Sequence, residues 1–451
     1  MKIAIAETPS FSLITVMPPM RVISRNQAAW SAGLMVVAIF LSAWLSHPQH
    51  RISAFAVNAA PAGTESVAPQ ASYIARFASS DLDDFVHSSA VTALPGGDLM
   101  SVWFAGSREG AGDVEIRTSR FDASSGEWGG EQVLATREST QSGTGKYIRK
   151  LGNPVIALAP DNRLWLFYVS VSVGGWAGST VNAMVSSDMG ASWSPPWQLV
   201  TSPFLNISTL VRGAPVFHAD GSIGLPVYHE FLGKFAEYLY LSADGEVIDK
   251  FRISRGKNSL QPTVVPLDGQ RAVALLRYAG ETFHRVLASR TEDGGQTWSE
   301  PQPLTPSNPN SSLAAVGVPG KGLLVALNDL REGRFKLSLY STDEQMKVWR
   351  PLPDLDKSPD PLGTPFALEA YKAAIGEGFR ASSGTRRQPL EAEFLNNLDQ
   401  RVCSAQGCDF EYEYPYFIRS PDGLYHLVYS WNNTFIKHVS FNEAWLAEQL
   451  L

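Results

Sequence analysis

The amino-acid sequence predicts an all-β protein, a six-bladed β-propeller, and three observations support this fold class. The 451-residue chain contains 12 Trp, 14 Tyr and 22 Phe with 37 Gly and 29 Pro, a composition that favours short strands and tight turns. A turn signal followed by an apolar strand recurs six times. A Ser/Thr-x-Asp-x-Gly-x-x-Trp motif occurs twice in register with those strands. A single propeller can be this long.

The N-terminal region contains an apolar segment at 28–46 that has no charged residue and follows Arg21 and Arg25. A positive flank before an apolar stretch is typical of a signal peptide or a membrane anchor helix. Residues 1–27 are then either a cytoplasmic stretch or an over-called start of translation. We therefore expect an exported protein that is periplasmic, with or without an inner-membrane anchor, or secreted.

Residues 47–72 are rich in Ala, Pro and Ser and are predicted to form a linker to a propeller at 73–451. Each repeat in the propeller pairs an Asp-Gly turn, or a close relative, with the strand that follows it, and another strand-like run precedes it. The repeats are spaced by roughly 50–65 residues, which suits four-stranded blades. The six strands that follow the turns lie at 99–104, 163–170, 222–229, 270–278, 323–329 and 424–431.

The last interval is longer, and the excess falls in 353–405, where the sequence is partly helical. We predict an insertion before the last blade, either bordering a binding face or lying on the surface without a role. Cys403 and Cys408, the only cysteines, close it. In an exported protein such a pair is expected to form a disulfide. No further metal ligands accompany the pair, and we expect no metal or cofactor.

The Ser/Thr-x-Asp-x-Gly-x-x-Trp motif occurs at 186–193 and 291–298. Its Asp and Ser or Thr side chains can bind nearby main-chain amides, its Gly can adopt a positive φ, and its Trp can pack on the blade. The motif is therefore interpreted as a structural turn. We expect Trp193 and Trp298 to be buried at equivalent places.

Three stretches, HSSAVTALPGGDLMSVWFAGSREGAGDVEI, GNPVIALAPDNRLWLFYVS and YPYFIRSPDGLYHLVYSW, resemble the bacterial BNR-repeat (Asp-box) branch of the sialidase superfamily. The resemblance covers about residues 73–440 and implies a sialidase-like propeller and a glycoside hydrolase. Sialidases hold the sugar carboxylate with three arginines. They attack the anomeric carbon with a Tyr that a Glu activates, and an Asp serves as acid and base.

The resemblance implies functional roles for several residues. Tyr414, eight residues before Asp422, matches the nucleophile, with Tyr412 as the alternative. Arg277 and Arg334 match two of the arginines. In the loop SREGAGDVEI, Asp113 matches the acid/base and Arg108 is a substrate-binding candidate. Structural roles remain open for each: a packed strand Tyr, strand-end arginines and a turn-capping Asp.

Two departures from the family pattern put standard sialidase chemistry in doubt. His87 stands where the first arginine is expected. Gln261 stands in place of the activating Glu, and an amide cannot act as a general base. Glu230 is a possible substitute base, although a salt bridge is an alternative role for it.

Counting back from each turn gives one polar residue at the start of each inner strand. In a propeller these side chains should converge at the mouth of the central channel, where a sugar could bind. Arg212 could thereby supply the cation that is missing at His87 and act with Arg277 and Arg334. The six positions are His87, Asn153, Arg212, Gln261, Ser312 and Tyr414.

Three functions fit these residues. The first is an exo-glycosidase that hydrolyses a terminal acidic sugar of an exported or surface glycan. The second is a non-catalytic propeller that binds acidic polysaccharide, and the third is a polysaccharide lyase. The formal charge of −7 and the absence of a basic run longer than Arg149–Lys150 argue against nucleic acid as a partner.

Overall fold

The computed structural model describes the chain in two compact units, Met1–Arg51 and Ile52–Leu451. In the first unit, helix α1 (Arg25–Leu45) contains most of the predicted apolar segment. Among the described residues, no helix is both long and apolar enough to cross a membrane. Much of the predicted N-terminal stretch 1–27 and of the linker 47–72 lies outside the described residues. Those that the structure describes are 25–45, 51–57, 70–82, 84–202, 205–256, 258–383, 387–398 and 402–450.

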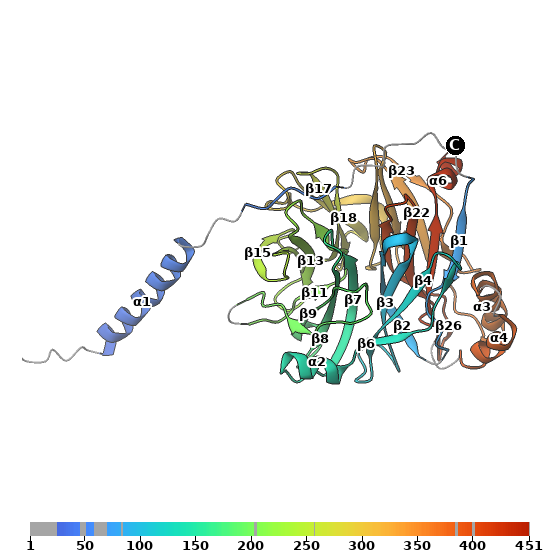
Figure 1. Cartoon of the computed structure of the whole chain (residues 1–451), viewed down its shortest axis with the longest axis horizontal. Helices are drawn as coiled ribbons and strands as arrows, with labels where there is room; N and C mark the ends of the chain where they lie inside the picture. Colours follow the sequence, from blue (N-terminus) through green and yellow to red (C-terminus); the bar gives the residue numbers. More distant parts are fainter. Residues whose placement is uncertain are drawn as a thin grey trace, which may run out of the picture. The chain divides into compact units, whose positions relative to one another are not determined.

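The second unit confirms the predicted six-bladed β-propeller (Figure 1). Its six sheets are antiparallel and follow one another along the chain. Blade 1 contains β2 (Phe85–Ala93), β3 (Leu99–Gly106), β4 (Glu115–Asp122), β5 (Glu127–Trp128) and β6 (Gln132–Ala135). Blade 2 contains β7 (Lys150–Leu158), β8 (Leu164–Val171), β9 (Ser179–Ser186) and β10 (Trp197–Gln198). Blade 3 contains β11 (Leu210–Val211), β12 (Val216–Phe217), β13 (Ile223–His229), β14 (Phe235–Leu241) and β15 (Val247–Arg252).

The second half of the ring follows the same plan. Blade 4 contains β16 (Ser259–Pro266), β17 (Ala272–Tyr278), β18 (Arg285–Thr291) and β19 (Gln302–Ser307). Blade 5 contains β20 (Ala314–Val318), β21 (Gly322–Leu327), β22 (Lys336–Thr342), β23 (Trp349–Pro351) and β24 (Asp356–Lys357). Blade 6 contains β27 (Tyr412–Arg419), β28 (Tyr425–Trp431), β29 (Phe435–Phe441) and β1 (Tyr73–Phe77). In each sheet, the strand next to the inner strand is the one that the turn signals predict. These second strands are β3, β8, β13, β17, β21 and β28.

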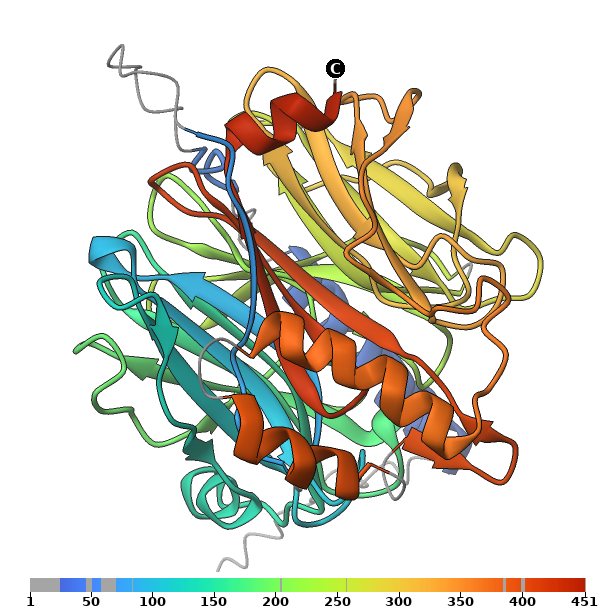
Figure 2. The same ribbon diagram turned by 90° about the vertical axis from the view of Figure 1, so that its right-hand side faces the viewer.

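The N-terminal strand β1 completes the last blade and so closes the ring. It pairs antiparallel with β29, from Tyr73 opposite Phe441 to Phe77 opposite Lys437. Figure 2 shows β1, in blue, running beside the red strands of blade 6. The first and last strands of the propeller therefore belong to one sheet.

The second strands of the blades form the core because neighbouring blades cover both of their faces. All eight residues of β3 and all eight of β8 are buried. Short, almost continuous apolar runs are what such strands require. The start of each inner strand is thereby held on a rigid scaffold.

The two copies of the Ser/Thr-x-Asp-x-Gly-x-x-Trp motif, which is called the Asp box, have the same hydrogen bonds. In blade 2, Asp188 accepts from the hydroxyl of Ser186 at 2.7 Å and from the main-chain N–H of Ser192 at 2.8 Å. In blade 4, Asp293 accepts from Thr291 and Thr297 at 2.8 Å each. Their structural interpretation therefore agrees with the geometry.

The tryptophans of the two Asp boxes differ from expectation in one respect. Trp193 and Trp298 pack against the hydrophobic clusters of their blades but are half-buried rather than buried. They lie at the turns after the third strands, where the rim of the propeller leaves one side of each ring open to solvent.

The insertion before the last blade is partly helical, as the sequence predicts. It contains α3 (Leu368–Ser382), α4 (Arg387–Asn396) and the hairpin of β25 (Cys403–Ser404) and β26 (Gly407–Cys408), in which a disulfide joins Cys403 to Cys408. Figure 2 shows α3 and α4 in orange over blade 6. The Phe379 ring of α3 lies 5.8 Å from that of Phe77 in β1, which places the insertion against the closing strand.

Short helices and one extra segment complete the propeller. Residues 52–56, within the predicted linker, pack on blade 3: Phe55 is buried and forms a bridge with His218. The linker prediction did not anticipate this contact. The short helices are η1 (Pro95–Gly97), α2 (Arg137–Thr144), η2 (Trp176–Gly178) and α6 (Glu443–Leu450).

Candidate active site

Four inner strands contain a β-bulge near their start. The pairing of β2, β7, β16 and β27 with the next strand skips two residues there. The first skipped residue has a positive φ in every case, and such bulges re-aim side chains. These residues are Ser88 (55°), Asn153 (45°), Gln261 (49°) and Tyr414 (51°).

The bulges correct one of the predicted equivalences. Ser88, not His87, occupies the position equivalent to Asn153, Gln261 and Tyr414. His87 occupies the position before it, which in β27 belongs to Glu413. The inner-strand prediction was therefore one residue early in blade 1.

Tyr414 lies at the half-exposed mouth of the ring, beside Arg277 from the second strand of blade 4. Nη1 of Arg277 lies 3.5 Å from the Tyr414 hydroxyl oxygen and donates to Oε1 of Gln261 at 3.1 Å. Nε of Arg277 donates to Oδ1 of Asn310 at 2.7 Å. Gln261 thus holds a guanidinium group, and the structure brings three of the predicted residues together.

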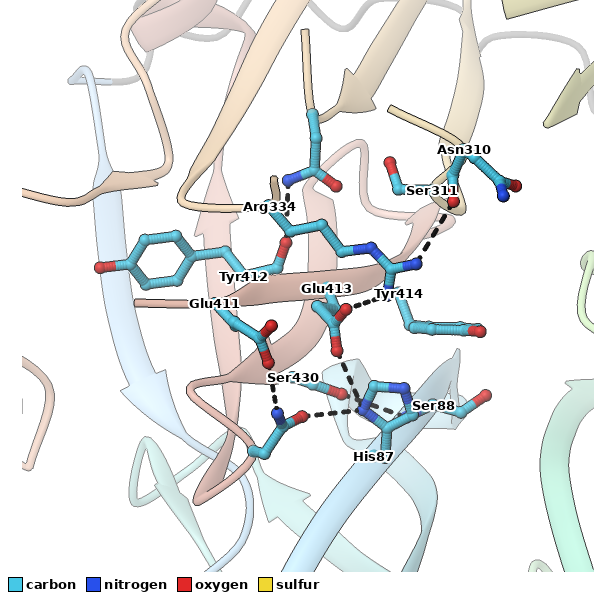
Figure 3. Close-up of polar contacts among 12 residues, drawn as sticks. His87, Ser88, Asn310, Ser311, Arg334, Glu411, Tyr412, Glu413, Tyr414 and Ser430 are labelled. Carbon is cyan, nitrogen blue, oxygen red and sulfur yellow. Dashed lines mark hydrogen bonds and ion pairs between the residues drawn. The ribbon is translucent and has the colours of Figure 1, made fainter. Parts of the chain in front are cut away.

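Arg334 forms an ion pair with Glu413, the residue before Tyr414 (Figure 3). Burial opposes ionisation of Glu413, but the electrostatic effect of His87, together with the charge and hydrogen bond of Arg334, outweighs burial, so the pKa of Glu413 is lowered. The other carboxylate oxygen of Glu413 lies 3.5 Å from Nδ1 of His87. Arg334 is therefore already paired with an acid within the protein.

His87 stands between blade 1 and blade 6. Its Nδ1 lies 3.0 Å from Oδ1 of Asn433, whose amide nitrogen donates to Glu411 at 2.8 Å. Because both neighbours of Nδ1 are hydrogen-bond acceptors, the neutral ring carries its proton on Nδ1. Burial lowers the pKa of His87, so the ring is neutral at pH 7. Its ring centroid is 4.4 Å from that of Tyr414.

Glu411 is the second carboxyl group at this edge of the mouth. Burial, together with the negative charge of Glu413, raises the pKa of Glu411 to about 7. Figure 3 shows Glu411 and Glu413 on the same side of the chain segment that enters β27. A half-buried carboxyl group that exchanges a proton near neutral pH therefore lies close to Tyr414 along the chain.

Arg212 has a different place from the one that the sequence predicts. It follows β11 in blade 3 and donates Nη2 to the main-chain carbonyls of Tyr414 and Pro415, the latter at 3.0 Å, in the opposite blade. It is only 3% exposed, so it cannot stand beside Arg277 and Arg334 as a third guanidinium group at the mouth. Burial lowers its pKa to about 10, which leaves it charged at pH 7 beneath the Tyr414 bulge.

The predicted acid and base lie on loops at the mouth. Asp113 is exposed, and its carboxylate accepts from the main-chain N–H of Ser107 at 3.1 Å and from the Ser107 hydroxyl at 3.0 Å. Arg108 in the same loop is exposed. Glu230 is half-buried, and burial raises its pKa.

The remaining predicted positions line the wall below the mouth. Asn153 accepts from Ser88 at 3.2 Å and donates to the hydroxyl of Tyr228 at 3.1 Å, to which Gln261 also donates, at 3.4 Å. Ser312 is buried. Tyr412 is buried too and faces Lys357, to whose carbonyl it donates at 3.3 Å, which leaves Tyr414 as the tyrosine at the mouth.

Sequence reasoning missed the groups that hold the arginines and His87. Asn310 and Asn433 stand in loops whose sequences indicate only turns. Glu413 lies between Tyr412 and Tyr414, the two candidate nucleophiles, and was not itself assigned a role. Alternation along β27 was the one usable signal, because Glu411 and Glu413 are two residues apart and so share a face. The loop residues gave none.

The fold and this site define a sialidase-like propeller. The sequence profile of the BNR repeat-like domain matches residues 97–427, and the chain therefore belongs to that family. A sequence comparison with curated proteins gives no match.

Solved structures share the fold at low sequence identity. The Hadza microbial sialidase Hz136 is 15% identical with a TM-score of 0.58, and the alignment covers 79% of this chain and 65% of that protein. A protein of unknown function from Dyadobacter fermentans is 11% identical with a TM-score of 0.57, covering 82% and 98%. The intramolecular trans-sialidase from Ruminococcus gnavus, solved with oseltamivir carboxylate, is 14% identical with a TM-score of 0.52, covering 81% and 96%. Such identities establish the fold alone.

Proposed function

We propose that the protein is an exo-glycosidase that hydrolyses a terminal acidic sugar of an exported or surface glycan. The contact between Arg277 and Tyr414 carries this proposal: a guanidinium nitrogen lies 3.5 Å from the hydroxyl of the candidate nucleophile. Both residues are half-exposed at the channel mouth. A cation and a nucleophile are thus presented together to a ligand.

The spacing suits a sugar whose carboxylate is bonded to the anomeric carbon. The carbon that Tyr414 would attack and the carboxylate are then adjacent, so the cation that binds the carboxylate must lie close to the nucleophile. Nη2 of Arg277 makes no hydrogen bond to any residue that the structure describes, and it is free to bind a carboxylate oxygen. A charge-assisted bond of this kind is stronger than a neutral one.

The proposed reaction has two steps. The Tyr414 oxygen forms a bond to the anomeric carbon while the bond to the leaving oxygen breaks, and Asp113 gives that oxygen a proton. In the second step Asp113 takes a proton from water, which attacks the same carbon and releases Tyr414, and the base that took the Tyr414 proton returns it to the Tyr414 oxygen. Gln261 cannot accept the Tyr414 proton, and we assign that role to Glu230, a half-buried carboxyl group that interacts electrostatically with Arg277.

The second candidate is a propeller that binds acidic polysaccharide without cleaving it. One observation favours it: Gln261 holds Arg277 at the place where a base for Tyr414 would be expected. Such a protein would use the mouth and its arginine for binding alone.

A covalent trap separates the two candidates. Protein incubated with a 2,3-difluorinated sialic acid should gain the mass of one sugar on Tyr414, measured by mass spectrometry of the intact chain and of its peptides. Tyr414→Phe is the matched control and should gain none. If wild type binds N-acetylneuraminic acid in calorimetry but is never labelled and never releases it from a glycan, the binding function replaces the enzyme.

We also propose that the protein acts outside the cytoplasm. The apolar segment at 28–46 and its preceding arginines support this, and a glycan substrate would be found there. Fusing alkaline phosphatase after residue 72 tests it: activity in cells supports export, and a fusion active only after a known signal is added excludes it.

A further inference from the structure

Asn310 accepts hydrogen bonds from both arginines of the mouth, and no other residue in the described part of the chain does so. Its side-chain oxygen accepts from Nε of Arg277 at 2.7 Å, and its main-chain oxygen accepts from Nη2 of Arg334 at 3.3 Å. Figure 3 shows Asn310 across from the Arg334 guanidinium group. Asn310 therefore links the two guanidinium groups directly.

The backbone holds Asn310 firmly in this position. Its φ is 57°, in the left-handed region that Asn tolerates better than other residues with a side chain. Asn308, which is fully buried, accepts from the main-chain N–H of Ser311 at 3.0 Å and donates to its hydroxyl at 3.2 Å. The main chain of Asn308 in turn donates to His284 at 2.9 Å. These bonds fix the loop on either side of Asn310.

The two arginines differ in whether an acidic side chain is hydrogen-bonded to them. Arg334 forms an ion pair with Glu413, whereas Arg277 donates its hydrogen bonds to the uncharged oxygens of Gln261, Asn310 and Tyr414. Amide oxygens hold a guanidinium group in place without cancelling its charge. An Asp at position 310 would hold Arg277 equally well but would neutralise it.

We propose that Asn310 is a positioning residue that determines specificity for acidic ligands: it fixes Arg277 relative to Arg334 and leaves the charge of Arg277 for a ligand carboxylate. This inference rests on the proposed function, because it assumes that the ligand carries a carboxylate. It adds the residue on which discrimination between an acid and its uncharged ester depends.

Two substitutions separate position from charge. Asn310→Gly removes the side-chain acceptor but keeps the left-handed backbone and the main-chain oxygen that binds Arg334. Asn310→Asp keeps the acceptor and adds a negative charge. The matched control is Asn162→Gly, at an exposed turn of blade 2 with a φ of 65°. All three should keep the thermal midpoint of wild type within a few degrees.

The probe is 2-deoxy-2,3-didehydro-N-acetylneuraminic acid, compared with its methyl ester by titration calorimetry. Wild type and Asn162→Gly should prefer the acid. Asn310→Gly and Asn310→Asp should each lose about tenfold or more of that preference, the scale of one charge-assisted hydrogen bond. The ratio of acid to ester affinity reports on recognition, and a merely destabilised fold would weaken both ligands alike.

The outcomes are distinguishable. If wild type shows no preference for the acid, or binds neither probe, the proposed function fails and this inference falls with it. If wild type prefers the acid and both Asn310 variants keep that preference, the role of Asn310 is wrong while the proposed function stands. If only Asn310→Asp loses the preference, the charge argument holds and the positioning role is refuted.

Discussion

Replacing Glu413 with Gln should destabilise the folded protein, because it leaves Arg334 without the charge that compensates it. The side chain of Glu413 is 6% exposed and that of Arg334 is 26% exposed. Gln has nearly the same size and can still accept from Nδ1 of His87, so shape and that contact are retained. The perturbation is therefore confined to one negative charge.

The size of the effect follows from the burial of the pair. Removing one partner of a fully buried ion pair costs about 3–5 kcal/mol. Arg334 keeps about a quarter of its side-chain exposure, and water screens part of the uncompensated charge, so we expect about 2–3 kcal/mol. Urea unfolding followed by tryptophan fluorescence measures it. The double variant Arg334→Met/Glu413→Gln should regain more than half of the loss, because neither charge remains.

Two results would refute this reasoning. A Glu413→Gln variant with the wild-type urea midpoint and slope would show that Arg334 does not need its partner. A double variant whose loss equals the sum of the two single losses would show that the two side chains do not interact energetically.

Three further predictions concern the scaffold. Asp293→Ala in the blade 4 Asp box should lower the free energy of unfolding by about 2 kcal/mol, since several hydrogen bonds to its carboxylate are lost; an unchanged urea midpoint would contradict this. Burial lowers the pKa of His426 to about 4 from 6.5, and that of its neighbour His438 is also lowered. The unfolded chain therefore binds protons first, so the contribution of His426 to stability is full above about pH 6.5 and falls by about 3 kcal/mol as the pH drops to 4, and His438 adds to this fall; His426→Gln should make the fall smaller in urea titrations at each pH. Unreduced native protein should take up no iodoacetamide, since Cys403 and Cys408 form a disulfide; two alkylated thiols would disprove the bond.

The blade count was predictable because every blade repeats the same local chemistry. An Asp-Gly turn needs residues that tolerate a positive φ, and the apolar strand after it has to fill the space between two neighbouring blades. Both requirements act within a few residues, so they leave a periodic signal. The place of Tyr414 followed from the same counting, since it stands at a fixed offset from a turn, whereas that of Arg277 was implied by the resemblance to sialidases.

The contacts within the site were not predictable in this way. Counting back from the turn placed His87 where the structure has Ser88, although the same bulge recurs in β7, β16 and β27, where the count was correct. The position of Arg212 depends on a carbonyl in the opposite blade, more than 200 residues along the chain. Asn310 acquires its role only when Arg277 of blade 4 and Arg334 of blade 5 come together. Such contacts join distant segments, and no local spacing encodes them.

The closure of the ring by β1 has a consequence for the synthesis and folding of the protein. Tyr73 and its partner Phe441 are separated by roughly 370 residues, which a ribosome needs about 20–70 s to synthesise. During that interval β1 has no β29 to pair with, and its unpaired strand edge could pair with other nascent chains. A chain that ends before β29 (Phe435–Phe441) leaves β1 without its partner strand. The order of the strands in blade 6 therefore makes completion of the ring depend on the last strand of the chain.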